Sequence, residues 1–299
     1  MLLEALNTRS PLILDGAMGT ELQRRGVDTG LPLWSANALM ARPEVVLQIH
    51  KDYIAAGADI ITTNTFRTTR RTMRRANLPD RSRQLTASAV EMARHAREAF
   101  PDRNVLIAGS IAPLEDCYRP DLVPPDAQLR DEHAELAERL AGAGVDFLLI
   151  ETINTTREAF AACEAATRTG KEVVLSFVCD NSGHLLSGES VTDAVKSVAG
   201  LHPTAFSINC VSPRYLKQAI LNLQSSIDNL KLTNPIAVYG NVGLPENERQ
   251  GWEFTHDITA DEYARHAHQW MREGVSIIGG CCGTTPEYIM AMARDLKKP

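Results

Sequence analysis

Eight short apolar runs recur along this chain of 299 residues, and each is followed by a longer segment with helical periodicity. Short apolar runs of this kind predict buried β-strands, and the longer periodic segments predict α-helices. Regular strand–helix alternation predicts a parallel sheet with right-handed crossovers, and eight repeats is the number that closes a (β/α)8 barrel. The sequence therefore predicts an α/β protein, a TIM barrel in which residues 1–299 form a single domain.

The expected elements cover most of the chain. The strands are expected at Pro11–Asp15, Asp59–Thr65, Val105–Ile111, Phe147–Glu151, Glu172–Val178, Ala205–Cys210, Ile236–Asn241 and Ser276–Cys281. The helices are expected at Pro43–Ala56, Asp80–Phe100, Asp126–Ala143, Thr156–Thr169, Thr192–Ala199, Pro213–Ile227, Thr259–Glu273 and Pro286–Lys297. Thr259 and Glu262 have the spacing of a capping box, which supports a helix start at that point.

Polar or metal-binding residues end seven of the eight expected strands. They are Asp15, Asn64, Ser110, Glu151, Cys210, Asn241 and the pair Cys281 and Cys282. Active sites of such barrels lie at the carboxyl ends of the strands, so we expect these side chains to share one site. Glu151 follows a buried apolar run and must have a partner, which is either a substrate ammonium group or a local salt bridge or helix cap.

Two adjacent cysteines stand in the segment GGCCGTTP, residues 279–286. Adjacent cysteines rarely bond to each other without strain, but both can bind one metal ion, and zinc takes thiolate or imidazole ligands in a tetrahedral arrangement. Cys210 ends another apolar run 71 residues earlier, a separation too long for a zinc finger. We therefore expect Cys210, Cys281 and Cys282 to form a zinc site assembled by the fold, with the flanking glycines allowing close approach of a ligand. Three ligands leave a coordination position open for chemistry.

Other motifs carry weaker predictions. Cys117, Cys163 and Cys179 are each expected to fill space in the core. The segment DGAMGT at residues 15–20 predicts either an anion-binding loop or a plain turn, and it lacks the spacing of nucleotide-binding motifs. The run RTTRRTMRR, Arg67–Arg75, predicts the solvated face of a helix, with a phosphate-binding patch as the alternative.

Composition excludes several classes of protein. A net charge of −6 gives no basic surface for nucleic acid or an anionic membrane. No segment has the length of a membrane span, and the first residues do not have the pattern of a secretory signal. Six irregularly spaced cysteines are typical of a reducing compartment. We expect a cytoplasmic protein that binds neither nucleic acid nor membrane; whether it forms a homo-oligomer is left open.

Five motifs together resemble the homocysteine S-methyltransferase family, which shares a zinc-dependent barrel with betaine–homocysteine methyltransferase and with the homocysteine module of cobalamin-dependent methionine synthase. They are DGAMGTEL from Asp15, TTNTF from Thr62, ET at Glu151, INC at Ile208 and GGCCGTTPEYI from Gly279. The resemblance extends from about Leu12 to Ile289. LWSA at Leu33 resembles the branch that uses S-methylmethionine. The chain departs from the family at 239–243, which reads YGNVG where Tyr-Pro-Asn-x-Gly is common.

The resemblance implies roles for the site residues. Zinc is expected on the three cysteines, with the sulfur of homocysteine completing its shell. The amino acid part of homocysteine is expected on Asp15, Glu151 and the backbone of Ala17, Met18 and Gly19. Asn64, Asn209 and Asn241 complete the expected substrate-binding set, and no catalytic residue is expected beyond the zinc site.

The expected reaction transfers a methyl group from a small onium donor to homocysteine and gives methionine. S-methylmethionine is the first candidate donor and betaine the second. The alternatives are a homocysteine-activating module that uses a methyl-corrinoid or methyl-folate partner protein, and a noncatalytic zinc- or thiol-binding barrel. The donor pocket is expected from the loops at residues 116–125 and 244–257, where Trp252 and Phe254 either face a cationic methyl group or pack on the rim.

Overall fold

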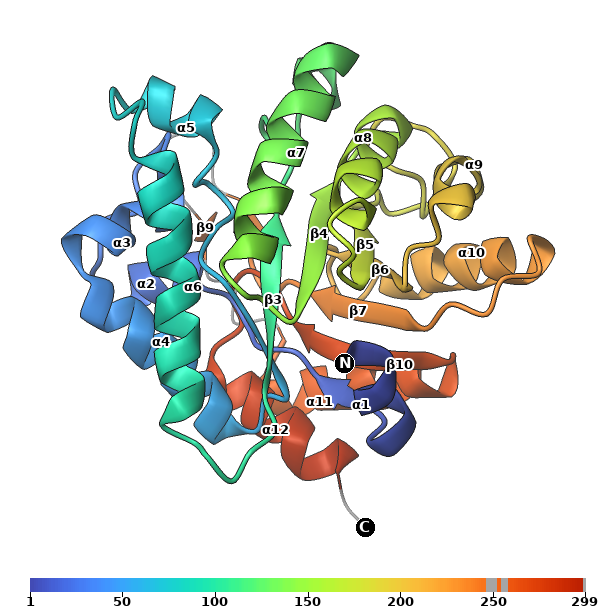
Figure 1. Ribbon diagram of the computed structural model, residues 1–299. Coiled ribbons are helices and arrows are strands. Elements are labelled where there is room, and N and C mark those ends of the chain that lie inside the picture. The colour runs from blue at the N-terminus through green and yellow to red at the C-terminus, as the bar shows by residue number, and fades with distance from the viewer. Residues whose placement is uncertain (246–251, 254–257, 298–299) are drawn as a thin grey trace.

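The computed structural model describes residues 1–245, 252–253 and 258–297, and it confirms the predicted barrel. Eight parallel strands form one sheet in the order β1-β10-β7-β6-β5-β4-β3-β2. They are β1 (Leu12–Ile13), β2 (Ile60–Thr62), β3 (Leu106–Ile111), β4 (Phe147–Ile153), β5 (Val173–Phe177), β6 (Ala205–Asn209), β7 (Ile236–Gly240) and β10 (Val275–Gly280). A parallel bridge between Leu14 and Ile60 brings the two outer strands together, so the sheet closes on itself (Figure 1).

The eight predicted helices are present and lie around the strands. They are α4 (Pro43–Ala56), α6 (Ser82–Glu98), α7 (Asp126–Gly142), α8 (Thr156–Thr167), α9 (Val191–Val198), α10 (Leu216–Asn229), α11 (Ala260–Arg272) and α12 (Pro286–Leu296). The predicted capping box forms at Thr259 and Glu262. The start expected at Pro213 was wrong, because residues 212–215 form a turn in which Tyr215 N donates to Ser212 O at 2.9 Å.

Several short elements were not predicted. They are α1 (Leu2–Thr8), α2 (Gly19–Arg24), α3 (Ala38–Ala41), three 3-10 helices, η1 (Trp34–Asn37), η2 (Pro120–Leu122) and η3 (Ala199–Leu201), and the antiparallel pair β8 (Leu244–Pro245) and β9 (Trp252–Glu253). Most of them are too short for periodicity to reveal. The helix expected within Arg67–Arg75 is present as α5 (Arg70–Arg75). None of the described helices is long and apolar enough to span a membrane.

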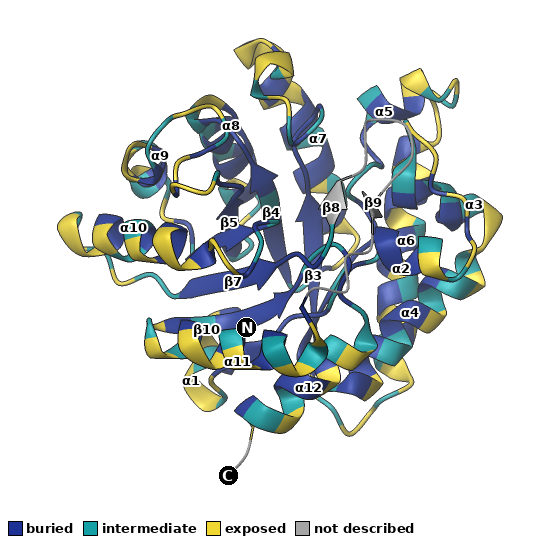
Figure 2. Ribbon diagram, turned by 180° about the vertical axis from the view of Figure 1, so that it is seen from behind, coloured by how far each residue is buried: buried dark blue, intermediate teal, exposed yellow. Residues whose placement is uncertain are grey.

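The core has two main parts. The larger part lies between the strands and the surrounding helices, which present their exposed residues outward (Figure 2). The smaller part is formed mainly by strand residues such as Leu12, Phe147 and Ile277, together with Leu2 and Ala5 of α1. Glu172, just before β5, accepts hydrogen bonds from Leu2 N at 2.6 Å and Leu3 N at 3.0 Å. Helix α1 therefore packs against the amino ends of the strands, opposite the edge at which β6 and β10 lead into the cysteines.

Two of the expected strand ends were wrong. Strand β4 continues past Glu151 to Ile153, with a register shift against β5 between Ile150 and Ile153 and a positive φ of 62° at Thr152. Strand β2 ends at Thr62, because Thr65 N turns back to Thr63 O at 2.8 Å. Such irregularities re-aim single side chains and cannot be read from an apolar run.

Candidate metal centre and substrate pocket

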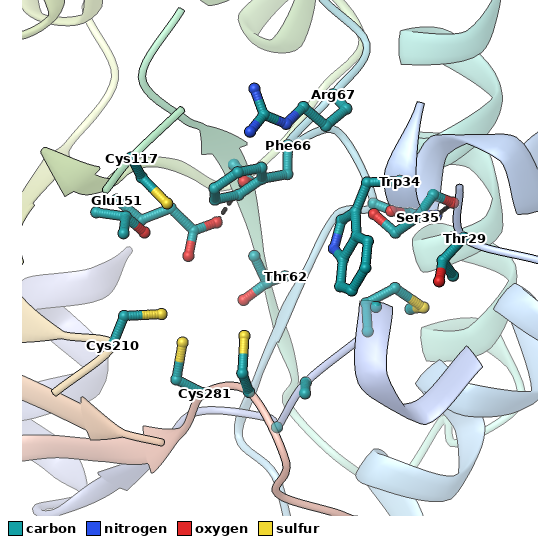
Figure 3. Close-up of a pocket in the computed structure, with 18 of the residues that line it drawn as sticks. Thr29, Trp34, Ser35, Thr62, Phe66, Arg67, Cys117, Glu151, Cys210 and Cys281 are labelled. Carbon is teal, nitrogen blue, oxygen red and sulfur yellow. Dashed lines mark hydrogen bonds between the residues drawn. The ribbon is translucent and has the colours of Figure 1, made fainter. Parts of the chain in front are cut away.

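Three thiols converge at the carboxyl ends of β6 and β10. The sulfur atoms of Cys210, Cys281 and Cys282 all lie within 4.8 Å of one another. None of the cysteines is in a disulfide. In the part of the chain that the structure describes, this is the one group of three His, Cys, Asp or Glu side chains with such spacing. The thiols of Cys210 and Cys281 point toward each other at the edge of an open space (Figure 3).

Backbone contacts between neighbouring strands seat these cysteines. Cys281 N donates to Gly240 O at 2.7 Å, and Val242 N donates to Cys282 O at 2.8 Å. Gly283 has φ of 83°, and a Cβ there would lie 1.7 Å from the carbonyl oxygen of Val242. The glycine therefore allows two chain segments to pack closely, and the expectation that the glycines open a path for a ligand was wrong at this position.

The departure from the family motif also has a local reason. Gly240 stands where the family commonly has proline, and its N–H donates to the hydroxyl of Tyr263 at 2.8 Å. Proline has no N–H and could not make this bond. The hydroxyl of Tyr263 in turn donates to Gly279 O at 2.7 Å, so it connects the ends of β7 and β10 beside the cysteines.

The three thiols form hydrogen bonds with one another. Hydrogen bonds from Cys210 and Cys282 hold the pKa of the Cys281 thiol well below its ordinary value. The same hydrogen bond to Cys281 raises the pKa of Cys210. One thiolate is thus stabilised by two thiols, and a thiophilic cation would stabilise all three as thiolates. The donor set and its spacing fit a soft or borderline metal ion such as zinc.

Two carboxyl groups lie near the thiols. Asp15 is buried, and its two oxygens accept from Thr62 N at 2.8 Å and Thr62 Oγ1 at 2.9 Å. Burial raises the pKa of Asp15 to about 7 despite these bonds. Glu151 accepts a hydrogen bond from the Ser110 hydroxyl, and burial raises the pKa of Glu151 to about 8. A cation bound beside either group would favour its charged form.

A cavity of about 870 Å³ connects these groups, a size typical of small-molecule sites. The predicted residues that line it are Asp15, Ala17, Met18, Gly19, Asn64, Glu151, Cys210, Cys281 and Cys282. The amide of Ala17 is already used, because it donates to Thr284 Oγ1 at 3.3 Å. Asn64 donates to Ser35 O at 2.9 Å, and its own side-chain oxygen has no partner among the described residues. That oxygen is enclosed within the wall of the cavity.

Two predicted residues do not line the cavity. The side chain of Asn209 is fully buried and bonds to Thr152 N at 2.9 Å and Ser176 Oγ at 2.7 Å, so it holds β4, β5 and β6 together. Asn241 donates to Gly243 O at 3.4 Å in its own turn. Both are explained by local structure, and neither is among the residues that face the cavity.

The cavity wall includes groups that the sequence analysis did not select. Trp34, Phe66, Arg67 and Tyr118 all line it (Figure 3 labels the first three). Trp34 belongs to the LWSA motif, and this motif was the feature of the sequence that could have indicated a role for Trp34 in the site. The loop at 116–125, which was expected to line a donor pocket, contributes Asp116, Cys117, Tyr118 and Arg119 to the cavity wall. Cys117 is buried as expected and also lines the cavity. Burial raises the pKa of the Cys117 thiol to about 12, with the nearby Arg67 opposing the increase.

A buried pair anchors the start of the 116–125 loop. Glu158 Oε1 on α8 accepts from Leu114 N at 2.8 Å and lies 3.0 Å from His133 Nε2 on α7. Both side chains are fully buried. The second expected loop, 244–257, falls largely outside the described residues, as do Phe254 and the side chain of Trp252.

Residues 12–296 match the family model of homocysteine S-methyltransferase. The chain belongs to this family. Homocysteine S-methyltransferase 2 of Zea mays is 31% identical over 96% of this chain and 90% of its own length. Selenocysteine Se-methyltransferase of Brassica oleracea var. italica is 30% identical over 95% and 88%. Among solved structures, the metallated form of the homocysteine methyltransferase MmuM from Escherichia coli matches with a TM-score of 0.84 and 32% identity, over 98% of this chain and 99% of that one.

Proposed function

We propose that this family member transfers a methyl group from a small onium donor to the sulfur of homocysteine, giving methionine, with S-methylmethionine as the first donor and betaine as the second. The observation that carries the proposal is the convergence of three thiols on the cavity that Glu151 and Asp15 also line. The named relatives and the metallated neighbour support it.

Zinc is the proposed metal, held by Cys210, Cys281 and Cys282. When bound, zinc would keep a thiol substrate deprotonated at neutral pH, since a coordinated thiol loses its proton. The three protein thiolates keep the surroundings electron-rich, which favours a nucleophilic sulfur. Glu151 and Asp15 are proposed to bind the ammonium group of homocysteine, because that cation would relieve the cost of their burial.

The bond changes are simple. A lone pair of the homocysteine sulfur forms the new S–CH3 bond as the bond from the methyl carbon to the onium sulfur breaks. The electron pair of that bond stays on the donor sulfur, which becomes a neutral thioether. With S-methylmethionine both products are methionine, and the thiol proton leaves to solvent before transfer. Trp34 and Phe66 give the cavity aromatic faces that suit a cationic donor.

The test is methionine formation from homocysteine by metal-loaded protein, with S-methylmethionine, betaine, S-adenosylmethionine and methyl-folate each supplied alone. The proposal expects turnover with S-methylmethionine or betaine, and loss of turnover in Cys210→Ala. A protein that binds one metal per chain but transfers no methyl group from any of the four would contradict it. That result would favour a methyl-corrinoid partner protein or a noncatalytic barrel.

A selenium acceptor is a second candidate substrate. The relative from Brassica oleracea, at 30% identity, is named for selenocysteine. A selenolate is softer than a thiolate and suits the same metal site. Selenocysteine and selenohomocysteine, each offered with the donor that works for homocysteine, distinguish the acceptors by their kcat/KM. The free state of all six cysteines fits action in a reducing compartment such as the cytoplasm.

A further inference from the structure

The arginines of the run 67–75 have different surroundings. Three of the five are in ion pairs that attach α5 to α7 and to the loop after β3. Arg71 pairs with Glu115 at 2.9 Å and Glu132 at 2.6 Å, and Arg75 pairs with Glu115 at 2.5 Å. Arg70 pairs with Asp131 and with Glu135. These pairs satisfy the cations, so the run as a whole is not a phosphate-binding patch.

Arg67 instead lines the cavity. Its Nη1 donates to the backbone oxygen of Glu115 at 3.1 Å, while the Glu115 carboxylate is taken by Arg71 and Arg75. The guanidinium of Arg67 lies 5.4 Å from the centre of the Phe66 ring. Within the described residues Arg67 forms no ion pair. Arg67 is therefore held in place by neutral groups, with most of its N–H donors unused.

An unpaired guanidinium at a cavity wall favours an anionic ligand. Guanidinium has five N–H donors in a planar fork that matches a carboxylate, and partial burial raises the cost of leaving it without a counter-charge. The cavity also has carboxyl groups, but Glu151 interacts with Ser110, Cys281 and Asp15 and not with Arg67. Figure 3 shows Arg67 at the opposite side of the space from Cys210 and Cys281, with Phe66 beside it. A further carboxyl, Asp116, is engaged by Tyr118 N at 2.9 Å.

We propose that Arg67 binds the carboxylate of the methyl donor, so that the pocket selects onium donors that carry a carboxylate. The inference rests on the proposed function for the presence of a donor. The acceptor is expected against Asp15, Glu151 and the thiols, which leaves the Arg67 side of the cavity for the second substrate. Arg67 is thereby a specificity-determining residue that takes no part in the bond changes.

The experiment compares donors that differ only in the anionic group. S-methylmethionine is paired with its methyl ester, and betaine is paired with choline. The metal-loaded full chain is measured as wild type, Arg67→Gln and Arg67→Met, which keeps the aliphatic stem over Phe66. Arg74→Gln is the matched control, because Arg74 is in the same run, is exposed and forms no ion pair with the residues that the structure describes. Binding is measured by titration calorimetry, and kcat/KM is measured separately for donor and for homocysteine.

Wild type is expected to prefer each carboxylate donor over its partner without the carboxylate by roughly 10- to 100-fold, the strength of a charged hydrogen-bonded pair. Both Arg67 variants should lose that preference, because binding of the carboxylate donor weakens while binding of the ester or choline is unchanged. Arg74→Gln should behave as wild type, and the KM of homocysteine should stay within about twofold in every variant. Circular dichroism and Tm identify a variant that fails to fold. If one Arg67 variant does not fold, the donor preference of the other tests the proposal.

Two results would overturn the proposal. An unchanged acid-to-ester ratio in a folded Arg67 variant would show that Arg67 does not bind the donor carboxylate. A higher KM for homocysteine with unaltered donor preference would place Arg67 on the acceptor. Failure of the proposed function is seen separately, as absence of methyl transfer by wild type. In that case the calorimetric titrations still test the proposal. Tighter binding of the carboxylate donors that depends on Arg67 would support the carboxylate site, and no binding of either carboxylate donor would overturn the proposal.

Discussion

The indole of Trp34 occupies the space in which any residue larger than glycine would place its side chain at position 19. A Cβ on Gly19 would lie 2.3 Å from Nε1 and 2.6 Å from Cε2 of Trp34. Gly19 was expected to supply a backbone contact to the substrate, but this packing gives it a second role. Trp34 lines the cavity, so the size of residue 19 fixes the position of an aromatic wall.

Gly19→Ala should therefore move Trp34 and weaken binding in the cavity. We expect kcat/KM for the donor to fall by roughly tenfold, about 1.4 kcal/mol, because the methyl group displaces a packed ring. Gly142→Ala is the control, since a Cβ there meets nothing within 4 Å. Steady-state kinetics measure the effect, and equal values for Gly19→Ala and wild type would show that Trp34 does not contribute to the pocket.

Replacing a cysteine of the cluster should remove the metal. Cys210→Ser or Cys281→Ser leaves two thiols, and metal content should fall from about one ion per chain to a small fraction, with methyl transfer lost. Cys163→Ala is the matched control, because Cys163 is buried in α8 away from the cavity. Elemental analysis after dialysis measures the metal. Full metal retention in Cys281→Ser would mean that this thiol is not a ligand.

The stability of the metal-free protein should depend on pH through Glu151. Burial raises its folded-state pKa from the ordinary 4.5 to about 8, so the folded protein binds more protons than the unfolded chain between these values. The free energy of unfolding therefore falls as pH rises through this window. Glu151→Gln removes this contribution. The free energy of unfolding of the variant minus that of wild type should therefore increase between pH 5 and pH 8, by on the order of 2 kcal/mol.

Urea denaturation of metal-free, reduced protein at several pH values measures the difference. Glu98→Gln is the control, because Glu98 is exposed on α6 and should shift the curve little at any pH. A constant difference between Glu151→Gln and wild type across the range would contradict the raised pKa.

Helix α1 should contribute stability without affecting the site. Leu2 is fully buried in the cluster that includes Phe147, whereas Leu3 is 45% exposed. Leu2→Ala should lower the free energy of unfolding by about 2 to 4 kcal/mol, because it removes a buried side chain and leaves a cavity. Leu3→Ala should cost less than about 1 kcal/mol. Both variants should keep the KM of homocysteine, and a raised KM in Leu2→Ala would show that this end of the barrel affects the cavity.

Local pattern was enough to predict the barrel, because each strand is an apolar run and each long helix has its own periodicity. The cysteine cluster was equally accessible, since Cys210 and Cys281 both follow such runs. The details that depend on tertiary packing were not accessible. Glu151 projects from within β4 through an irregularity, and Asn209 bonds to neighbouring strands. The unpaired state of Arg67 depends on which of its neighbours take the Glu115 carboxylate.

The distance along the chain between Cys210 and Cys281 sets an order of events during protein synthesis. Cys210 is synthesised 71 residues before Cys281, the first of its two partner thiols. Until β10 has joined β7, the growing polypeptide offers an incoming ion only one thiol of the cluster. Binding of an ion by all three thiols would thus come late, after β10 has formed, and a product that terminates before β10 would lack both the complete thiol cluster and the last wall of the barrel.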